Sequence, residues 1–368
     1  MMSVLDTGIK NVRNVLRYTA GEGSLAELAK LIESRRVAHD SPAVFFIDEF
    51  FKTRPDIVAG LGMGSPDVAI HVATADEPST DAVDQAVADL RERRAGEPAV
   101  IVGMGGGITM DFAKAVANLL TNGGRAEDYQ GWDLVKVPGI YKIAVPTLSG
   151  TGAEATRTCV MTNKRTGLKL GMNSDFTVFD QIVMDPALTA TVPRNQYFYT
   201  GMDAYIHCME SLAGSYRNGI GDAYSRETIN LCRQVFLEGD MMSAANRERM
   251  MVASYLGGCA IATSYVGVVH PFSAGLSVVL GLHHCVANCI VMRAMEDFYP
   301  DACSEFWTMV EEQGIEIPAG VCCGLTDEQY EQLYAATVIH AKPLTNALGD
   351  DFQRVLTRER VIDIFKAM

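Results

Sequence analysis

Short apolar runs alternate with helical patterns through the first half of the chain, and this alternation constrains the fold more than any other feature. Four runs are typical of buried strands, namely Ala43–Ile47, Val68–Val72, Ala99–Val102 and Ile143–Val145. Between them, apolar residues recur at helical spacing after Thr80 and again after Thr109. Strands that alternate with helices form mostly parallel sheets covered on both faces. Residues 1–186 are therefore predicted to form an α/β domain.

The second half of the chain has a different character. After Asp185 and Pro186 it offers long helix-compatible segments and few alternating β-branched residues. These segments span residues 199–214, 221–237, 244–265, 274–298 and 326–341. A chain of 368 residues is long enough for two domains, so we expect an all-α domain over residues 187–368. Because no extended linker separates the halves, we expect a ligand-binding cleft between them.

Two glycine-rich turns follow predicted strands, at Gly103–Gly107 and at Ser149–Gly152. Glycines let a backbone approach a phosphate group, and the free N–H groups of a following helix attract the anion. The G-x-G-x-x-G fingerprint is not met, because the sixth residue from Gly103 is Ile108. A tight structural turn therefore remains an alternative for each. Together, the two turns favour a pyrophosphate-bearing cofactor at one edge of the sheet.

Asp48 follows directly on the first predicted strand. A carboxylate at this position can accept hydrogen bonds from a ribose diol and repels a 2′-phosphate, which favours NAD over NADP. An exposed helix cap is the alternative interpretation.

Charge and cysteine usage narrow the partners and the compartment. Lys and Arg number 31 against 45 Asp and Glu, a net charge of −14, so nucleic acid and anionic membrane surfaces are poor partners. The stretch between Arg249 and Arg293 carries no charged side chain, but its histidines, proline and glycines favour a buried helical pair over a membrane span. Nine cysteines without a C-x-x-C pair, and an N-terminus without a signal-peptide core, predict a cytoplasmic protein with reduced thiols.

Asp203 and His207 lie four residues apart in an apolar segment, which places both on one face of a helix. A buried carboxylate needs a strong partner, and a metal ion would serve. His270 and His284 lie in the uncharged stretch, separated by close to four helical turns. One carboxylate and three neutral imidazoles suit Zn²⁺ or Fe²⁺. A helix-surface pair of Asp203 with His207 is the alternative.

The neighbours of these residues need separate roles. His283 and His284 are adjacent and do not easily face one ion together, so one of them is expected outside the ligand set, as a proton carrier. Cys208 and Cys285 each follow a proposed ligand, and we expect both to point away from it as packing residues.

Several motifs, taken in order, resemble the iron-containing (group III) alcohol dehydrogenases. Residues 105–114 (GGGITMDFAK) are similar to that family's GGGSxxDxxK segment, and residues 146–156 to its PTxxGTGSExT. Residues 201–207 follow its G-x-DAxxH order, and His270 and His284 stand where its remaining two metal ligands would be. The resemblance covers most of the chain. It implies a dinucleotide-binding α/β domain followed by a helical metal-binding domain, the architecture shared with dehydroquinate synthase.

The resemblance also implies the site residues. The metal ligands would be Asp203, His207, His270 and His284. The cofactor-side candidates would be Asp48, Gly105, Gly106, Asp111, Thr147, Ser149 and Lys169. Three positions depart from the family: Ile108 replaces a serine, Ala274 replaces a second histidine, and Cys285 replaces the glycine after the fourth ligand. These departures leave the proton relay open and make His283 the candidate catalytic residue.

The implied activity is that of an NAD- and metal-dependent oxidoreductase, a homodimer, which oxidises a primary alcohol to an aldehyde. Residues 281–289 (GLHHCVANC) are similar to the 3-deoxy-D-manno-octulosonate 8-oxidase branch, which acts on the C8 hydroxyl of that sugar acid for lipopolysaccharide biosynthesis. Arg157 and Lys169 could meet such a carboxylate, with a place on the exposed surface as the alternative. The rival functions are a generic NAD-dependent alcohol dehydrogenase or aldehyde reductase, and a dehydroquinate synthase-like lyase.

Overall fold

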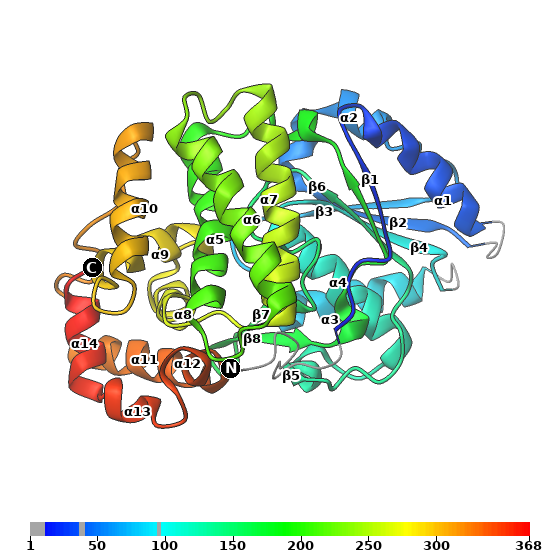
Figure 1. Cartoon of the computed structure of the whole chain (residues 1–368). Helices are drawn as coiled ribbons and strands as arrows, with labels where there is room; N and C mark the ends of the chain where they lie inside the picture. Colours follow the sequence, from blue (N-terminus) through cyan, green and yellow to red (C-terminus); the bar gives the residue numbers. More distant parts are fainter. Residues whose placement is uncertain (1–11, 37–40, 94–96) are drawn as a thin grey trace. The chain divides into compact units, whose positions relative to one another are not determined.

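The computed structural model describes residues 12–36, 41–93 and 97–368 (Figure 1). Residues 1–11, which include most of the segment inspected for a signal peptide, lie outside the described residues. The chain divides into two compact units, Arg13–Thr191 and a helical unit built on Val192–Met368. The predicted boundary at residue 186 coincides with the start of a short 3₁₀ helix, η5 (Pro186–Thr189).

The first unit contains a six-stranded sheet, all of whose strand pairs are parallel, in the order β1-β9-β6-β4-β2-β3 (Figure 1). Its strands are β1 (Arg17–Ala20), β2 (Ala43–Asp48), β3 (Val68–Val72), β4 (Val100–Gly105), β6 (Lys142–Pro146) and β9 (Gln181–Met184). Its helices are η1 (Ser24–Glu27), α1 (Leu28–Arg36), η2 (Glu49–Thr53), α2 (Pro55–Ala59), α3 (Thr80–Glu92), α4 (Gly107–Asn122), η3 (Ala126–Tyr129) and η4 (Asp175–Thr177). A smaller sheet has the order β5-β8-β7, from β5 (Gly131–Trp132), β7 (Thr158–Asn163) and β8 (Leu168–Asn173).

The central strands form because their sequences are apolar on both faces. All six residues of β4 are buried, as are the first five of β2. Continuous hydrophobic runs of this kind are typical of parallel strands covered by helices on both sides. The predicted α/β fold is therefore confirmed. The helix predicted after a Thr80 cap begins at that residue, and its cap is Ser79, whose Oγ accepts a hydrogen bond from the Ala82 amide at 3.2 Å.

The connections of β2 and β4 leave in opposite directions. The two strands are neighbours, with Ile47 opposite Met104. From β2 the chain continues to β3 on one side, and from β4 it continues through α4 to β6 on the other. The carboxyl ends of two such strands frame a crevice, which is where open α/β sheets bind ligands. Asp48 and Gly105 end these two strands.

The second unit is helical, which confirms the predicted class. It contains α5 (Arg194–Ala213), α6 (Gly219–Leu237), α7 (Ala244–Thr263), α8 (Val269–Leu280), α9 (His284–Val291), η6 (Met292–Ala294), α10 (Pro300–Gln313), α11 (Asp327–Val338), α12 (Ala341–Leu348), α13 (Phe352–Val355) and α14 (Arg358–Lys366). Helix α5 forms its centre, and every residue from Thr200 to Ser211 is buried. A helix that is covered on all sides can present polar residues only to other protein groups or to a bound ion.

The single helix predicted over residues 274–298 is wrong. Helix α8 ends at Leu280, Gly281 adopts a left-handed conformation with φ of +68°, and α9 begins at His284. Glycine at this position is a common helix terminator because it has no Cβ to clash. Because the apolar pattern continues through the break, the sequence did not indicate that one helix ends and another begins there. Within the described residues, no helix of the chain is long and apolar enough to cross a membrane.

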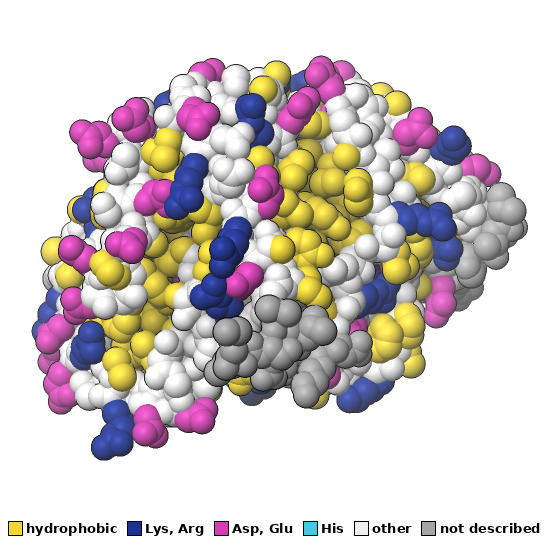
Figure 2. Space-filling model, viewed as in Figure 1, with side chains coloured by type: hydrophobic (Ala, Val, Ile, Leu, Met, Phe, Trp, Pro, Cys, Tyr) yellow, Lys and Arg dark blue, Asp and Glu magenta, His cyan; other side chains and the backbone are white. Residues whose placement is uncertain are grey.

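The drawn surface carries mixed charge. Acidic and basic side chains lie interspersed over the face shown in Figure 2, and hydrophobic side chains are gathered in places between them. Proteins that bind nucleic acid concentrate Lys and Arg in a stripe or patch. The described side chains of this face show no such basic stripe.

Candidate metal centre and cofactor site

The four predicted ligands come together in the helical unit. Asp203 and His207 lie one turn apart on α5, His270 is in the first turn of α8, and His284 is the first residue of α9. One ligand atom from each lies within 4.8 Å of every other. His270 and His284 therefore approach each other from two helices, and the four-turn spacing on which they were grouped is not the reason for their proximity.

The spacing of the ligand atoms fits a divalent cation. The Oδ1 atom of Asp203 lies 3.6 Å from Nε2 of His207, 3.3 Å from that of His270 and 3.8 Å from that of His284. A tetrahedral ion with bonds of about 2.1 Å separates its ligand atoms by about 3.4 Å. Three nitrogens and one carboxylate oxygen are a donor set that suits Zn²⁺ or Fe²⁺. The residues present therefore fit the group that the resemblance implies.

Burial and mutual charge set the protonation of the cluster. Burial by itself raises the pKa of Asp203, but the histidines around it outweigh burial and hold that pKa well below its usual range. Burial lowers the pKa of His207 to about 4, so its imidazole is neutral and keeps a lone pair for a cation. Burial also acts to lower the pKa of His270, but the carboxylates of Glu210 and Asp203 raise it to about 9.

Glu210 is a functional residue that the sequence analysis missed. It is fully buried on α5, and its Oε2 atom lies 2.5 Å from Nδ1 of His270. Its Oε1 atom accepts a hydrogen bond from the backbone N–H of Val269 at 2.5 Å. A carboxylate behind a ligating histidine fixes the ring and its tautomer, with Nε2 left for the ion. Glu210 lies seven residues after Asp203, and this spacing on one helix face was the signal that could have found it.

Helix α9 also contacts Asp203, which was not expected. Asn288 donates a hydrogen bond from Nδ2 to Asp203 Oδ1 at 2.6 Å, and the Sγ of Cys285 lies 3.7 Å from Asp203 Oδ2. The expectation that Cys285 points away from the cluster is therefore wrong, because the start of α9 directs this side chain at α5. Cys208 does point elsewhere, and its thiol contacts Thr228 and Ser225. All nine cysteines are free, and Cys323 is exposed.

His283, the predicted catalytic residue, is not part of the cluster. It is the N-cap residue of α9, with extended backbone, and its side chain is exposed. Ala274, where the family pattern has a second histidine, lies buried on α8. The catalytic role of His283 stays a prediction.

Three of the predicted cofactor residues lie together at the carboxyl ends of β2 and β4. A methyl group added at Gly105 would lie 2.7 Å from Thr109 and 3.0 Å from the Cβ of Asp48. Asp48 Oδ1 accepts hydrogen bonds from the Phe50 amide at 3.0 Å and from the Thr74 hydroxyl at 3.4 Å, and burial raises the pKa of its carboxyl. Asp48 therefore caps η2, the alternative that the sequence left open. Gly106 precedes α4, which directs free N–H groups at this turn.

The second glycine-rich turn lies beside the first. The backbone N–H of Thr147 donates to the Gly105 carbonyl at 3.0 Å, and a methyl group added at Gly106 would lie 2.8 Å from Leu148. Ser149 is buried, and its hydroxyl finds no hydrogen-bond partner among the described residues. A buried hydroxyl without a partner is unfavourable by about 1–3 kcal/mol. A ligand group that hydrogen-bonds to it would remove this unfavourable contribution.

Asp111 and Lys169 lie in a network of their own. Asp111 accepts a hydrogen bond from the Val160 amide of β7 at 2.9 Å and lies 3.6 Å from Lys114, while burial raises its pKa to about 6. Lys169 is buried on β8 and pairs with Glu77 at 2.8 Å. In these contacts the two residues tie α4 and the smaller sheet to their surroundings. Their role toward a cofactor stays a prediction.

Arg157, the other predicted cation, is not on the exposed surface. Its guanidinium pairs with Asp133 at 2.5 Å and with Asp175 at 3.3 Å, and only 14% of its side chain is exposed. A cation that is already paired with two carboxylates is a poor receptor for a substrate carboxylate, because the existing pairs must first be broken.

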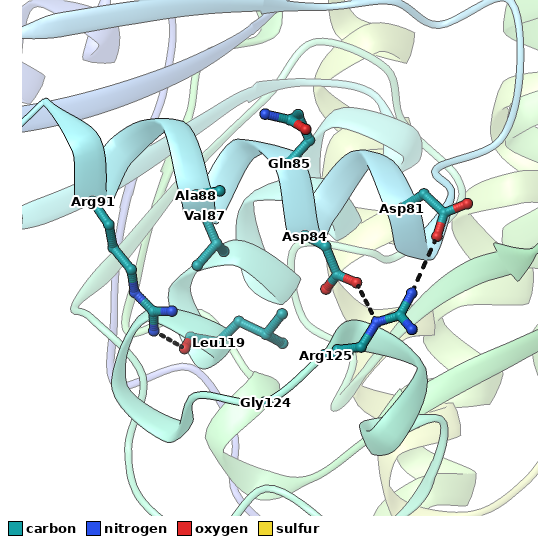
Figure 3. Close-up of a pocket in the computed structure, with 9 residues that line it drawn as sticks. All are labelled: Asp81, Asp84, Gln85, Val87, Ala88, Arg91, Leu119, Gly124 and Arg125. Carbon is teal, nitrogen blue, oxygen red and sulfur yellow. Dashed lines mark hydrogen bonds and ion pairs between the residues drawn. The ribbon is translucent and has the colours of Figure 1, made fainter.

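A pocket of about 390 Å³ lies between α3 and the end of α4 (Figure 3). Its polar residues already pair with one another: Arg125 with Asp84 at 3.3 Å and with Asp81 at 3.6 Å, and Arg91 with the Leu119 carbonyl at 3.3 Å. None of the predicted metal or cofactor residues lines it. We assign no role to this pocket.

Comparison with known proteins identifies the family. The family model for iron-containing alcohol dehydrogenase matches residues 16–186, and the model for the C-terminal part of the Fe-containing alcohol dehydrogenase family matches residues 197–313. Together they cover most of the chain. The chain therefore belongs to the iron-containing alcohol dehydrogenase family, and the resemblance seen in its motifs is confirmed.

Individual relatives agree with this assignment. Sulfoacetaldehyde reductase of Bilophila wadsworthia is 34% identical over 215 residues, 57% of this chain and 54% of the relative. Alcohol dehydrogenase from Oenococcus oeni superposes with a TM-score of 0.82 at 21% identity, over 97% of this chain and all of that one. Sulfoacetaldehyde reductase from Bifidobacterium kashiwanohense, solved in complex with NAD⁺, gives 0.75 at 21% identity over 96% of both chains. The aligned segments span 54–66% of the first curated relatives' own lengths.

Proposed function

We propose that this protein is an NAD-dependent, metal-dependent alcohol oxidoreductase that interconverts a primary alcohol and its aldehyde. The observation that carries the proposal is the buried cluster of one carboxylate and three imidazoles from three helices, at distances that fit one divalent cation. Membership of the iron-containing alcohol dehydrogenase family supports it independently.

The chain's own residues would hold the ion, orient one of its ligands and bind the diphosphate of the cofactor. Asp203, His207, His270 and His284 would hold the ion, which when bound supplies Lewis-acid stabilisation to a developing negative charge on the alcohol oxygen. Glu210 holds the His270 ring with Nε2 toward the cluster. The turns at Gly105–Gly106 and Thr147–Ser149 would hold the diphosphate of NAD, which when bound would supply the hydride acceptor.

His283 is the group that we propose carries the released proton to water. It is exposed and adjoins the ligand His284, and histidine side chains commonly serve as proton carriers. The expected result for His283→Ala is a protein that keeps its metal and loses rate. If His283→Ala loses the metal and His284→Ala keeps it, the assignment of the two neighbours must be exchanged.

The cofactor is proposed to be NAD, because Asp48 at the crevice would oppose the 2′-phosphate of NADP with a like charge. Dissociation constants for NADH and NADPH, measured by fluorescence titration, should differ by about tenfold or more in favour of NADH. Asp48→Asn should narrow the difference. Equal affinities in the parent protein would mean that Asp48 is only the cap of η2.

Two substrate classes deserve direct comparison. The likeness of residues 281–289 to the 3-deoxy-D-manno-octulosonate 8-oxidase branch points to a primary alcohol on a carboxylated sugar, whereas the relation to sulfoacetaldehyde reductase favours a small anionic aldehyde. We propose an anionic substrate, with the octulosonate C8 hydroxyl as first candidate. A panel of octulosonate, isethionate, ethanol and 1,2-propanediol tests this. Fast turnover of ethanol or propanediol would assign the protein to the generic alcohol dehydrogenases.

The same panel separates redox chemistry from a lyase. An alcohol dehydrogenase releases NADH in step with aldehyde, and an oxidase consumes oxygen. A dehydroquinate synthase-like lyase neither releases NADH nor consumes oxygen. Elemental analysis of protein purified without added metal distinguishes iron from zinc.

We further propose a homodimer in the cytoplasm, a compartment with which nine free cysteines agree. Light scattering on the purified protein tests the dimer.

A further inference from the structure

Asp203 is the one acidic residue of the metal cluster, and both of its oxygens are engaged. Its Oδ1 atom faces the three imidazole Nε2 atoms at 3.3–3.8 Å. Asn288 donates to the same oxygen, and Cys285 contacts the other. Asp203 itself is fully buried, so water cannot supply these contacts. The orientation of the carboxylate therefore depends on what α9 presents to it.

The amide nitrogen of Asn288 faces one carboxylate oxygen and two imidazole nitrogens. This Nδ2 atom lies 2.6 Å from Asp203 Oδ1, 3.4 Å from Nε2 of His270 and 3.3 Å from Nε2 of His284. The opposite atom, Oδ1 of Asn288, is buried without a hydrogen-bond partner among the described residues. Leaving an amide oxygen in that state is unfavourable by about 1–3 kcal/mol. The contacts that the N–H groups of Asn288 make with the cluster must therefore offset the unfavourable free energy of its unpaired amide oxygen.

Cys285 gives a matched comparison within the chain. Cys208 and Cys285 each follow a proposed ligand directly, and both are buried. The Sγ of Cys285 lies 3.7 Å from Asp203 Oδ2, whereas the Cys208 thiol contacts Thr228 and Ser225. An S–H group is a weak donor, so its effect on the carboxylate is smaller than that of the amide.

We propose that Asn288 and Cys285 are positioning residues that hold the two oxygens of Asp203 and so keep Oδ1 turned toward the three imidazoles and the metal. Helix α9 then contributes one ligand, His284, and fixes another that belongs to α5. Asn288 lies one turn after His284 and so shares its face of α9. The inference rests on the proposed metal site. It adds that the residue after the fourth ligand, glycine in the family pattern and cysteine here, takes part in holding Asp203.

The test measures metal binding directly. Metal-free protein is titrated with Co²⁺ against a chelator of known affinity, and the visible absorption of the Co²⁺-loaded protein reports the ligand geometry. We expect Asn288→Leu to weaken binding by roughly 10–100-fold and to change the Co²⁺ spectrum. Cys285→Ala should weaken binding a few-fold, Cys285→Ser should restore it because a hydroxyl keeps the donor, and the control Cys208→Ala should bind like the parent.

The possible outcomes are distinct. If the parent binds Co²⁺ and both Cys285→Ala and Asn288→Leu match its affinity and spectrum, the positioning roles are overturned while the metal site stands. If Cys208→Ala weakens binding as much as Cys285→Ala, general packing explains the effect and the role of Cys285 is overturned. If the parent itself binds no ion, the proposed metal site fails, and the inference fails with it. Should Asn288→Leu not fold, the three cysteine variants still decide.

Discussion

The metal cluster of the helical unit and the glycine-rich turns of the α/β unit are constructed in opposite ways. The cluster consists of side chains from three helices, and further side chains such as Glu210 hold those ligands in place. The turns consist of backbone, at points such as Gly105 where an added methyl group would meet other atoms. Truncating a side chain should therefore abolish function in one region, whereas adding a single carbon should do so in the other.

The largest effect is expected for His207→Ala. Removing one of four ligands should leave much less than one metal per chain, and kcat/KM should fall by more than about 100-fold because charge stabilisation worth several kcal/mol is lost. The variant should remain folded by circular dichroism and still bind NADH, since a chain of this size has a sizeable core without the ion. Full metal content in His207→Ala would remove this residue from the ligand set.

Glu210→Gln sharpens the comparison one step away from the ligands. The substitution keeps the size of the side chain but removes the negative charge behind His270, so metal affinity should fall roughly 10–100-fold. Glu305→Gln is the matched control. Glu305 is on α10 and accepts a 2.6 Å hydrogen bond from Tyr205, which is on α5 like Glu210 but is not a metal ligand. Equal losses in the two variants would mean that Glu210 acts through general packing.

Gly105→Ala tests the other region. The new Cβ would lie 2.7 Å from Thr109, so the turn must shift, which should destabilise the protein by about 1–3 kcal/mol and weaken NADH binding, with metal content unchanged. Gly64→Ala is the control, since a Cβ there meets no atom within 4 Å. A Gly105→Ala variant with parental NADH affinity would show that the turn does not hold the cofactor.

The smallest effect concerns Asp111 and pH. Burial raises its pKa from 3.8 to about 6, so between these values the folded state binds the proton more strongly than the unfolded state. The contribution of Asp111 to stability is therefore greatest at low pH and declines as pH rises through about 6. Denaturant unfolding gives the free energy of unfolding at each pH. From pH 4 to pH 7, that of Asp111→Asn should rise relative to that of the parent. A difference independent of pH would contradict this burial effect.

The α/β half could be predicted from sequence because strand and helix periods are local. β3 was predicted with the bounds that the structure shows. β4 was predicted to end at Val102 but continues to Gly105, and α4 begins at Gly107, two residues before the predicted start at Thr109. The spacing of Asp203 and His207 gave half of the metal cluster for the same reason. The same helical spacing places Glu210 on the face of Asp203, but its contact with His270 joins two helices and is not specified by a pattern within α5.

What could not be predicted depends on tertiary contacts. The apolar pattern of residues 274–298 does not distinguish one long helix from two, because apolar residues predominate both before and after the break at Gly281. The contacts of Cys285 and Asn288 with Asp203 follow from how α9 packs against α5, which no spacing within α9 specifies. His283 and His284 are separated only by the helix start between them, which leaves one exposed and directs the other at the cluster.

The break at Gly281 has a consequence for local stability. It leaves α9 as a helix of eight residues, too short to persist without tertiary contacts. An ion held by His284 together with ligands on α5 and α8 would act as a removable crosslink on this short helix. Its amide hydrogens should therefore exchange with solvent more slowly when the protein is loaded, and those of α4 should not change. Hydrogen–deuterium exchange would then report occupancy of the site in the absence of any substrate.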